Sequence, residues 1–169
     1  WKDYIVCDNR SRRHDFRGGT DTMFESEEQR TLMIVKPDGV QRGLIGEVIC
    51  RVERRGLKVI GLTMSWMDKS LAEQHYAVHY GKEFFDKLIK FITSSPVVLI
   101  AVEGYHAVNL VRRMMGALDP DEAARGSIRG DLALSRSYNV VHGSDTPENG
   151  EKEIALHFSD KEIYDYSRA

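Results

Sequence analysis

The chain has 169 residues with a formal net charge of −2, and 41% of its residues are hydrophobic, which suffices for one domain with a sizeable core. This near-neutral balance argues against a coat protein for nucleic acid or a membrane surface, and no apolar run approaches the roughly 18 residues of a membrane span. The two cysteines, Cys7 and Cys50, show no disulfide or zinc spacing, which suits a reducing, cytoplasmic compartment.

Residues 1–29 are polar and charged, and their hydrophobic residues follow no period. This composition predicts a flexible N-terminal leader, followed by a folded domain at residues 30–169. The apolar core of a signal peptide is not seen in the leader. Because the chain begins with Trp1, we take Met23 as a candidate natural start of a domain that is preceded by extra sequence.

The first part of the domain predicts a strand, a helix and a second strand. Residues 31–35 form a continuous apolar run, typical of a buried central strand, and residues 36–39 (Lys-Pro-Asp-Gly) predict the turn that stops it. Hydrophobic residues then recur at helical spacing over 44–55, and Gly56 supplies the helix C-cap. Residues 57–66 return to β character.

The middle of the chain predicts two helices, a strand and a third helix. The motif at 70–73 (Ser-Leu-Ala-Glu) predicts a capping box that opens a short helix. A second helix over 84–92, a buried strand over 97–102 and a helix over 106–115 follow. Residues 117–130 contain proline and glycine and predict a long loop, whose length favours a functional role.

The segment 139–145 (Asn-Val-Val-His-Gly-Ser-Asp) predicts the end of a buried strand that runs into a tight turn. Such a strand end would hold the ring of His142 firmly, while Gly143 would leave its far side open. A helix with Thr146 as its N-cap follows, which places Glu153 about two turns into that helix. We therefore expect a nucleophilic His142 whose ring is oriented by Glu153. The alternative for a single histidine at a strand end is a hydrogen-bonded structural role.

The predicted elements alternate between strands and helices along the whole domain. A compact solution is an α+β fold, namely a ferredoxin-like sandwich in which a four-stranded, mostly antiparallel sheet is covered by helices.

Three cations stand beside apolar residues at the ends of predicted elements, namely Lys36, Arg112 and Arg129. Such cations are costly unless they meet anions, and an arginine fork matches the oxygens of a phosphate. The alternative is that each one caps a helix or pairs with a carboxylate. The P-loop motif G-x-x-x-x-G-K-[ST] is absent from the sequence, so a nucleotide would be bound without that glycine cradle.

Two further features have competing interpretations. His75 and His79 stand four residues apart on a predicted helix, as metal ligands do, but no third ligand is evident and we favour solvated or partly buried histidines. Phe84, at the start of a helix, is suited to stacking on a nucleotide base, although its helical spacing favours the core.

Together these pieces make the chain resemble the nucleoside diphosphate kinase family over residues 30–166. The matching motifs stand in the family's order: Val35–Gly43, His75-Tyr76, Phe84-Phe85, Ser95–Val98, Gly126–Asp131 and Asn139–Asp145. The resemblance implies a phosphotransferase that moves the γ-phosphate of a nucleoside triphosphate to a nucleoside diphosphate and so maintains the pools of triphosphates. It also implies a ping-pong reaction through a phosphohistidine on His142.

The resemblance assigns further roles to individual residues. Glu153, Ser144, Lys36 and Tyr76 match family residues around the active histidine, whose Nδ1 atom reacts. The residues that match the family's nucleotide-binding positions are Lys36, Phe84, Leu88, Arg112, Leu118, Arg129 and Asn139. Mg²⁺ is the implied cofactor, held through the nucleotide phosphates rather than by dedicated side chains.

Two residues depart from the family's pattern. Leu118 stands where the family usually has a phosphate-binding threonine, and Arg136 stands where it usually has a small apolar residue. These departures motivate an alternative, a weakly active or inactive nucleotide-binding regulatory or scaffold protein on the same fold. The implied partners are nucleoside di- and triphosphates and further copies of the chain in a hexamer or tetramer, with residues 116–131 at subunit contacts. Neither a membrane nor a specific nucleic acid is an expected partner.

Overall fold

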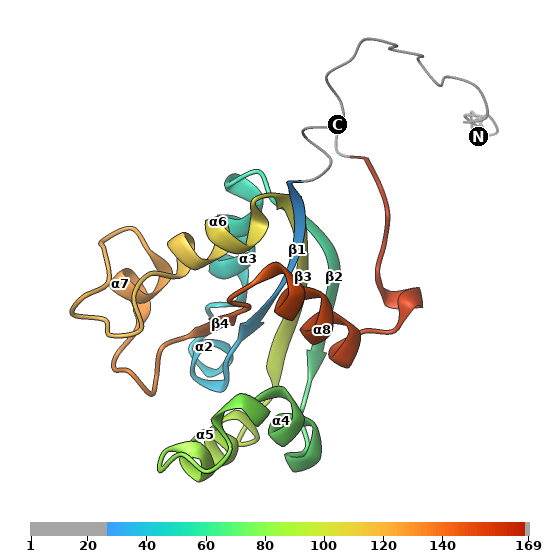
Figure 1. Ribbon diagram of the computed structural model, residues 1–169. Helices are drawn as coiled ribbons and strands as arrows, with labels where there is room; N and C mark the ends of the chain where they lie inside the picture. Colours follow the sequence, from blue (N-terminus) through green and yellow to red (C-terminus); the bar gives the residue numbers. More distant parts are fainter. Residues whose placement is uncertain (1–26, 168–169) are drawn as a thin grey trace, which may run out of the picture.

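Four strands form one sheet in the order β2-β3-β1-β4, and each neighbouring pair is antiparallel (Figure 1). They are β1 (Glu28–Val35), β2 (Lys58–Ser65), β3 (Val97–Tyr105) and β4 (Val141–Gly143). β1 and β3 lie at the centre, where their continuous apolar runs are buried on both faces.

The computed structural model describes residues 27–167, so the predictions made for residues 1–26, including a start at Met23, lie outside the described part. Within it, β1 begins at Glu28, two residues before the domain boundary predicted at residue 30.

Helices cover both faces of the sheet. One face carries α3 (Ile45–Arg54), α6 (Ala107–Met115) and α7 (Ile128–Leu132), and the other carries α4 (Lys69–His75), α5 (Phe85–Ile92) and α8 (Pro147–His157). The short α2 (Pro37–Gln41) follows β1, while two 3₁₀ turns, η1 (Ala77–His79) and η2 (Asp160–Glu162), follow α4 and α8. Figure 1 shows α3 and α6 on one side of β1 and α8 on the other. This is the α+β, ferredoxin-like sandwich that the sequence predicts. None of the described helices is long and apolar enough to cross a membrane.

The two cores follow from the alternation of side chains along β1. Leu32 and Ile34 face α4, α5 and α8, whereas Met33 and Val35 face α3 and α6. All four side chains are fully buried. Burial of each contributes about 1.5–3 kcal/mol relative to exposure, so β1 is the element that both layers stabilise.

Three local predictions were wrong. The turn predicted at 36–39 is the start of α2, with Pro37 in its first turn. The N-cap of α4 is Asp68 rather than Ser70, because the Asp68 carboxylate accepts a hydrogen bond from the Leu71 N–H at 2.8 Å. The loop predicted over 117–130 ends before Ile128, where Ser127 caps α7 through a hydrogen bond from the Gly130 N–H.

Two glycines let helices approach the sheet closely. A Cβ at Gly143 would lie 2.5 Å from the Met115 sulfur, so glycine allows α6 to pack on β4. A Cβ at Gly150 would collide with the carbonyl oxygen of Arg30, so the glycine that costs α8 about 1 kcal/mol relative to alanine brings α8 against β1.

Candidate active site

His142 lies in β4, directly opposite Ile34 of β1. Val140, two residues earlier, has φ of +68°, a left-handed conformation that costs a β-branched residue of the order of 1–3 kcal/mol. Two hydrogen bonds hold it: the Lys36 N–H donates to the Val140 carbonyl at 2.8 Å, and the Val140 N–H donates to Asp38 Oδ2 at 3.0 Å. The start of α2 therefore fixes the backbone from which the histidine projects.

Asp38 is a supporting residue that the sequence analysis missed. The sequence places it in a Pro-Asp-Gly turn, where aspartate is common for local reasons. In the structure its side chain is buried and reaches 102 residues along the chain to Val140. Only the tertiary contact reveals this role, because a turn aspartate and a strand-supporting aspartate look alike in sequence.

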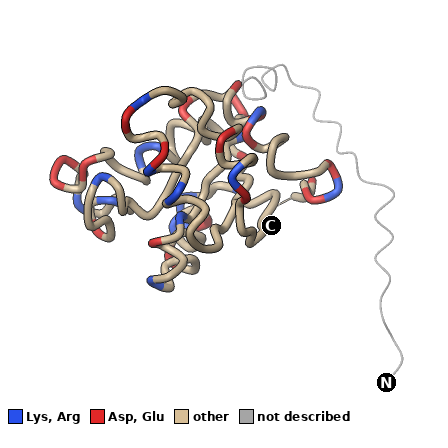
Figure 2. The backbone as a smooth tube through the Cα atoms, turned by 90° about the horizontal axis from the view of Figure 1, so that it is seen from below, with Lys and Arg blue, Asp and Glu red and all other residues tan. Residues whose placement is uncertain are grey.

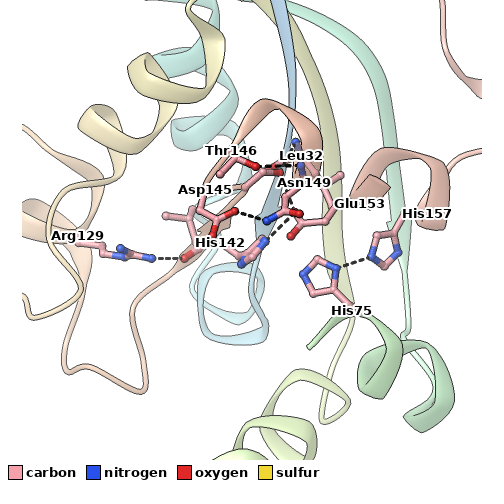
Figure 3. Close-up of polar contacts among 11 residues, drawn as sticks. Leu32, His75, Arg129, His142, Asp145, Thr146, Asn149, Glu153 and His157 are labelled. Carbon is pink, nitrogen blue, oxygen red and sulfur yellow. Dashed lines mark hydrogen bonds and ion pairs between the residues drawn. The ribbon is translucent and has the colours of Figure 1, made fainter. Parts of the chain in front are cut away.

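The His142 ring is held by a carboxylate from α8 (Figure 3). His142 Nε2 lies 3.1 Å from Glu153 Oε2, and the Ser144 hydroxyl donates to the same oxygen at 2.7 Å. Ser144 is in turn anchored to β1, because its Oγ accepts from the Leu32 N–H at 3.1 Å. An ionised carboxylate only accepts hydrogen bonds, so the ring hydrogen lies on Nε2 and Nδ1 keeps its lone pair. The predicted trio of His142, Ser144 and Glu153 is thus brought together in one hydrogen-bonded chain.

Two more histidines stand beside His142. The His75 ring meets the His142 ring edge-on, with centroids 4.7 Å apart, and His75 Nδ1 lies 3.1 Å from His157 Nε2 (Figure 3). Burial lowers the pKa of His75 to about 2 and that of His157 to about 4, so both rings are neutral near pH 7. Sequence analysis placed neither ring next to His142, although His75 belongs to a motif that it quoted.

Tyr76 and His79 border this group. The Tyr76 ring is buried 5.8 Å from the His142 ring, and burial together with the Glu153 charge raises the pKa of its phenol. His79 contacts Lys82 and the Phe84 ring instead. His75 ends α4 and pairs with His157, whereas His79 lies in η1, so the two histidines are not on one helix as the sequence predicts.

Lys36 and Asn139 lie together at the junction of β1 and β4. The Lys36 ammonium donates to Asn139 Oδ1 at 2.7 Å, and both residues are buried. Burial first, and the charge of Arg129 second, lower the pKa of Lys36 to about 8, against a smaller opposing effect of Asp38. The ammonium has three hydrogens, and the bond to Asn139 uses one of them.

Arg129 is 8% exposed, and its guanidinium donates to two backbone carbonyls, Gly116 O at 3.1 Å and Val141 O at 2.9 Å. Burial, followed by the charge of Arg112, lowers the pKa of Arg129 to about 10, which leaves it charged at neutral pH. Arg112 is exposed in the last turn of α6. Within residues 27–167, no carboxylate forms an ion pair with Lys36, Arg112 or Arg129.

Asp38 acts on Lys36 and Asp145 on Arg112 from beyond ion-pair distance, so this positive charge is only partly compensated. Over the rest of the described chain, basic and acidic residues are interspersed (Figure 2). A buried cation whose hydrogen bonds go to neutral oxygens, as those of Lys36 and Arg129 do, favours an incoming anion. The arrangement therefore suits a phosphate group beside the free Nδ1 of His142.

Four predicted residues, Phe84, Leu88, Leu118 and Arg136, are outside the hydrogen-bonded group of His142, Ser144 and Glu153. Phe84 is 48% exposed, whereas the adjacent Phe85 is buried in the core, so the helical stripe includes Phe85 rather than Phe84. Leu88 is partly buried against the same core. Leu118 is 50% exposed and Arg136 is exposed, so both present their side chains to solvent.

Comparison with known proteins shows a match to a family described as nucleoside diphosphate kinase over residues 29–163. The nucleoside diphosphate kinase of Pyrococcus furiosus is 54% identical over 147 residues, which cover 85% of this chain and 91% of that protein. The corresponding protein of Pyrococcus abyssi is 55% identical over 150 residues, which cover 87% of this chain and 94% of that one.

Solved structures agree with the sequence match. A nucleoside diphosphate kinase of Halobacterium salinarum in complex with CDP has a TM-score of 0.81 and 48% identity, covering 83% of this chain and 94% of that one. A transition-state mimic of the enzyme from Borrelia burgdorferi, with bound vanadate and ADP, has a TM-score of 0.80 and 41% identity, covering 85% of this chain and 94% of that one.

Proposed function

Because the chain belongs to the nucleoside diphosphate kinase family, we propose that it transfers the γ-phosphate of a nucleoside triphosphate to a nucleoside diphosphate through a phosphohistidine on His142. The observation that carries this proposal is the hydrogen bond from His142 Nε2 to Glu153, which leaves the Nδ1 lone pair for attack on phosphorus. A neutral imidazole has this lone pair near pH 7 and needs no separate base.

The proposed reaction runs in two halves. First, Nδ1 bonds to the γ-phosphorus as the bond to the β–γ bridging oxygen breaks, and the diphosphate leaves with that electron pair. Then a terminal oxygen of a second diphosphate attacks the phosphorus, and the P–N bond breaks to return the lone pair to Nδ1. The positive charge that develops on the ring is stabilised by Glu153, which Ser144 holds in place.

Positioning and charge neutralisation are the main contributions that a protein makes to phosphoryl transfer. Lys36, Arg112 and Arg129 would bind the phosphate oxygens, since the described protein offers none of them a carboxylate partner. Asn139 orients the Lys36 ammonium and would also contact the ribose and phosphates. Tyr76 would pack beside the phosphorylated ring.

The exposed ring of Phe84, at the N-cap of α5, supports a role in stacking on the base. Leu88, one turn further along α5, would contribute to the same base-binding surface. Stacking on an aromatic ring tolerates every base, because each base has a π face. The complexes of relatives with CDP and ADP fit this broad tolerance.

Mg²⁺ would be held through the phosphates in this site. Glu153 already uses one oxygen for both His142 and Ser144, and the neighbouring donors His75 and His157 are nitrogens, which Mg²⁺ does not favour. When bound, the ion supplies charge neutralisation on the β- and γ-phosphates, while the cationic side chains align the γ-phosphorus with Nδ1.

The rates of transfer test this proposal against the alternative of a scaffold protein. We expect parallel lines in double-reciprocal plots when ATP is varied at several concentrations of CDP, because the first product leaves before the second substrate binds. Chromatography of CTP and ADP measures the rate. Intersecting lines, or no CTP at any Mg²⁺ concentration, would contradict the two-half reaction.

Leu118→Thr should lower the KM for nucleotide roughly fivefold, because a hydroxyl at this exposed position restores one hydrogen bond to phosphate worth about 1 kcal/mol. Leu118→Val is the matched control, since valine has the shape of threonine without its hydroxyl. The KM of both variants is measured in the same transfer assay. Equal KM values for the threonine and valine variants would show that residue 118 does not reach the phosphates.

We further infer a homo-oligomer. β2 is an edge strand of the described sheet, and it and the residue after it expose a row of alternating apolar side chains, Leu62, Met64 and Trp66, each more than half exposed. An exposed apolar edge of this kind favours cover by another chain. Light scattering of the full chain distinguishes a tetramer from a hexamer.

We also propose a cytoplasmic location for the activity and an N-terminal leader before the kinase domain. Cys50 is a free thiol in the described chain, as suits a reducing compartment, and Mg²⁺ and nucleotides are abundant in the cytoplasm, where we place the activity. The leader to the kinase domain stays a prediction for residues 1–26, since the first strand of the domain begins at Glu28.

A further inference from the structure

A second set of ligand atoms converges on the ring of His142. His75, His142 and Glu153 each offer one such atom, and these atoms all lie within 4.8 Å of one another. We propose that these three residues form a site for a divalent transition metal of the Zn²⁺ class, and that the bound metal blocks phosphoryl transfer. The block rests on the proposed role of His142, whereas the metal site itself does not.

His75 is the residue that points to a ligand. Its ring is 9% exposed, and its Nε2 has no hydrogen-bond partner although it is buried. A buried nitrogen without a partner is costly whether it carries a hydrogen or a lone pair. Neither the proposed transfer reaction nor the packing of the core uses this atom, so a ligand that fills the position would relieve the cost.

His157 prepares His75 for this role. When His75 Nδ1–H donates to His157 Nε2, at their separation of 3.1 Å, the lone pair of His75 lies on Nε2 and is available to a metal. Metal-binding histidines usually donate their other N–H to a neighbouring acceptor, which fixes the tautomer and the ring orientation. His157 would supply that acceptor from α8.

The donor set and its spacing select the class of metal. Two imidazoles, one carboxylate and a water give the open four-coordinate site that Zn²⁺ adopts, and Mg²⁺ disfavours the nitrogens. Tetrahedral ligands about 2.0–2.1 Å from a metal lie about 3.3 Å apart, so the most separated pair needs to close by about 1.5 Å. Side-chain rotation supplies a movement of this size. The nearby Lys36 ammonium opposes a second cation, so we expect micromolar affinity.

The chemistry of the ring explains the block. If the metal binds His142 Nδ1, it occupies the lone pair that would attack phosphorus. If it binds Nε2, the neutral ring must carry its hydrogen on Nδ1, and the same lone pair is again lost. The metal also takes Glu153 away from its orienting hydrogen bond, so either mode of binding prevents transfer.

Co²⁺ is the spectroscopic probe for the site, since in a tetrahedral field it absorbs strongly in the visible range. Titration of the metal-free full chain should give bands that saturate at one Co²⁺ per chain and disappear when Zn²⁺ is added. His75→Gln should abolish these bands, and His157→Phe should weaken Zn²⁺ binding about 10–100-fold, because the phenylalanine ring fills the position without an acceptor. His106→Asn, at the partly exposed N-cap of α6, is the control and should bind as the parent does.

Inhibition is measured separately, as acid-labile phosphate on His142 after incubation with Mg²⁺ and ATP labelled in its γ-phosphate. At one Zn²⁺ concentration the parent should lose most of its label while His157→Phe retains it, although ATP binds Zn²⁺ equally in both assays. Bands that never saturate would overturn the metal site. So would bands that survive in His75→Gln, provided that the circular dichroism of this variant matches that of the parent. If His142 is labelled by ATP but the protein shows no Co²⁺ bands, the metal site alone is rejected. If the Co²⁺ bands appear but metal-free protein is not labelled by ATP, the proposed function and the block are both rejected.

Discussion

Replacing His142 by glutamine should lower phosphoryl transfer from ATP to CDP by at least about 10⁴-fold, because the proposed covalent intermediate forms on the Nδ1 lone pair of this ring. Glutamine keeps much of the volume of the ring and one amide group near Glu153, so the fold should persist. Its carboxamide nitrogen has no available lone pair and forms no phosphoryl intermediate. The rate of CTP formation measures the loss, with circular dichroism as the check on folding.

His106→Asn is the matched control for this variant. His106 adopts a left-handed conformation, which asparagine tolerates, and its contacts are with Tyr105 and Glu27 rather than with the site. We expect parental rates from His106→Asn. A His142→Gln enzyme that retains a tenth or more of the parental rate would exclude the covalent route through this residue.

Replacing Lys36 by methionine should lower kcat/KM by about 10²–10³-fold, which is the usual effect of removing one preorganised donor from a developing charge. Methionine preserves the length and the apolar stem of the buried lysine, so the loss should report on the ammonium. Asn139 loses its 2.7 Å partner in this variant, which adds a smaller effect on the position of the ribose.

The same lysine predicts a pH dependence. Because burial and Arg129 lower the pKa of Lys36 to about 8, the ammonium is charged below that pH and becomes neutral above it. The kcat/KM of the parent should therefore be highest below pH 8 and fall about tenfold per unit as pH rises further. ATP and CDP suit this measurement, because their bases do not titrate in this range.

Lys36→Arg separates this cause from others. The guanidinium stays charged throughout, so the variant should start from a lower kcat/KM and show no decline up to about pH 10. An alkaline decline of the same slope in Lys36→Arg would assign it to another group and contradict the role of the ammonium.

The strands and the main helices were predictable from sequence. A strand that is buried on both faces has a continuous apolar run, and a helix that is buried along one stripe has apolar residues at helical spacing. The run through Leu32 to Val35 is apolar throughout since each face of β1 meets a separate core. Boundaries were harder to predict. Asp68 and Ser70 are both good N-caps, and local preference does not distinguish them, although α4 is capped by the earlier one.

The site could be predicted in part. His142, Ser144 and Glu153 lie within a short stretch of chain, where strand, turn and helix spacing bring them together, and the structure joins them by hydrogen bonds. Contacts over long separations had no local signal. His75 and His157 are 82 residues apart and meet only because α4 and α8 cover the same face of the sheet.

The position of the phosphate on the reacted protein tests the central claim most directly. The full chain is incubated with Mg²⁺ and ATP labelled in its γ-phosphate, separated from nucleotide, and then divided between acid, alkali, peptide mapping and unlabelled CDP. The account predicts one phosphoryl group per chain, on His142, stable in alkali, lost in acid and transferred quantitatively to CDP. Acid-stable label on a serine or threonine, or label on His142 that CDP fails to remove, would contradict it.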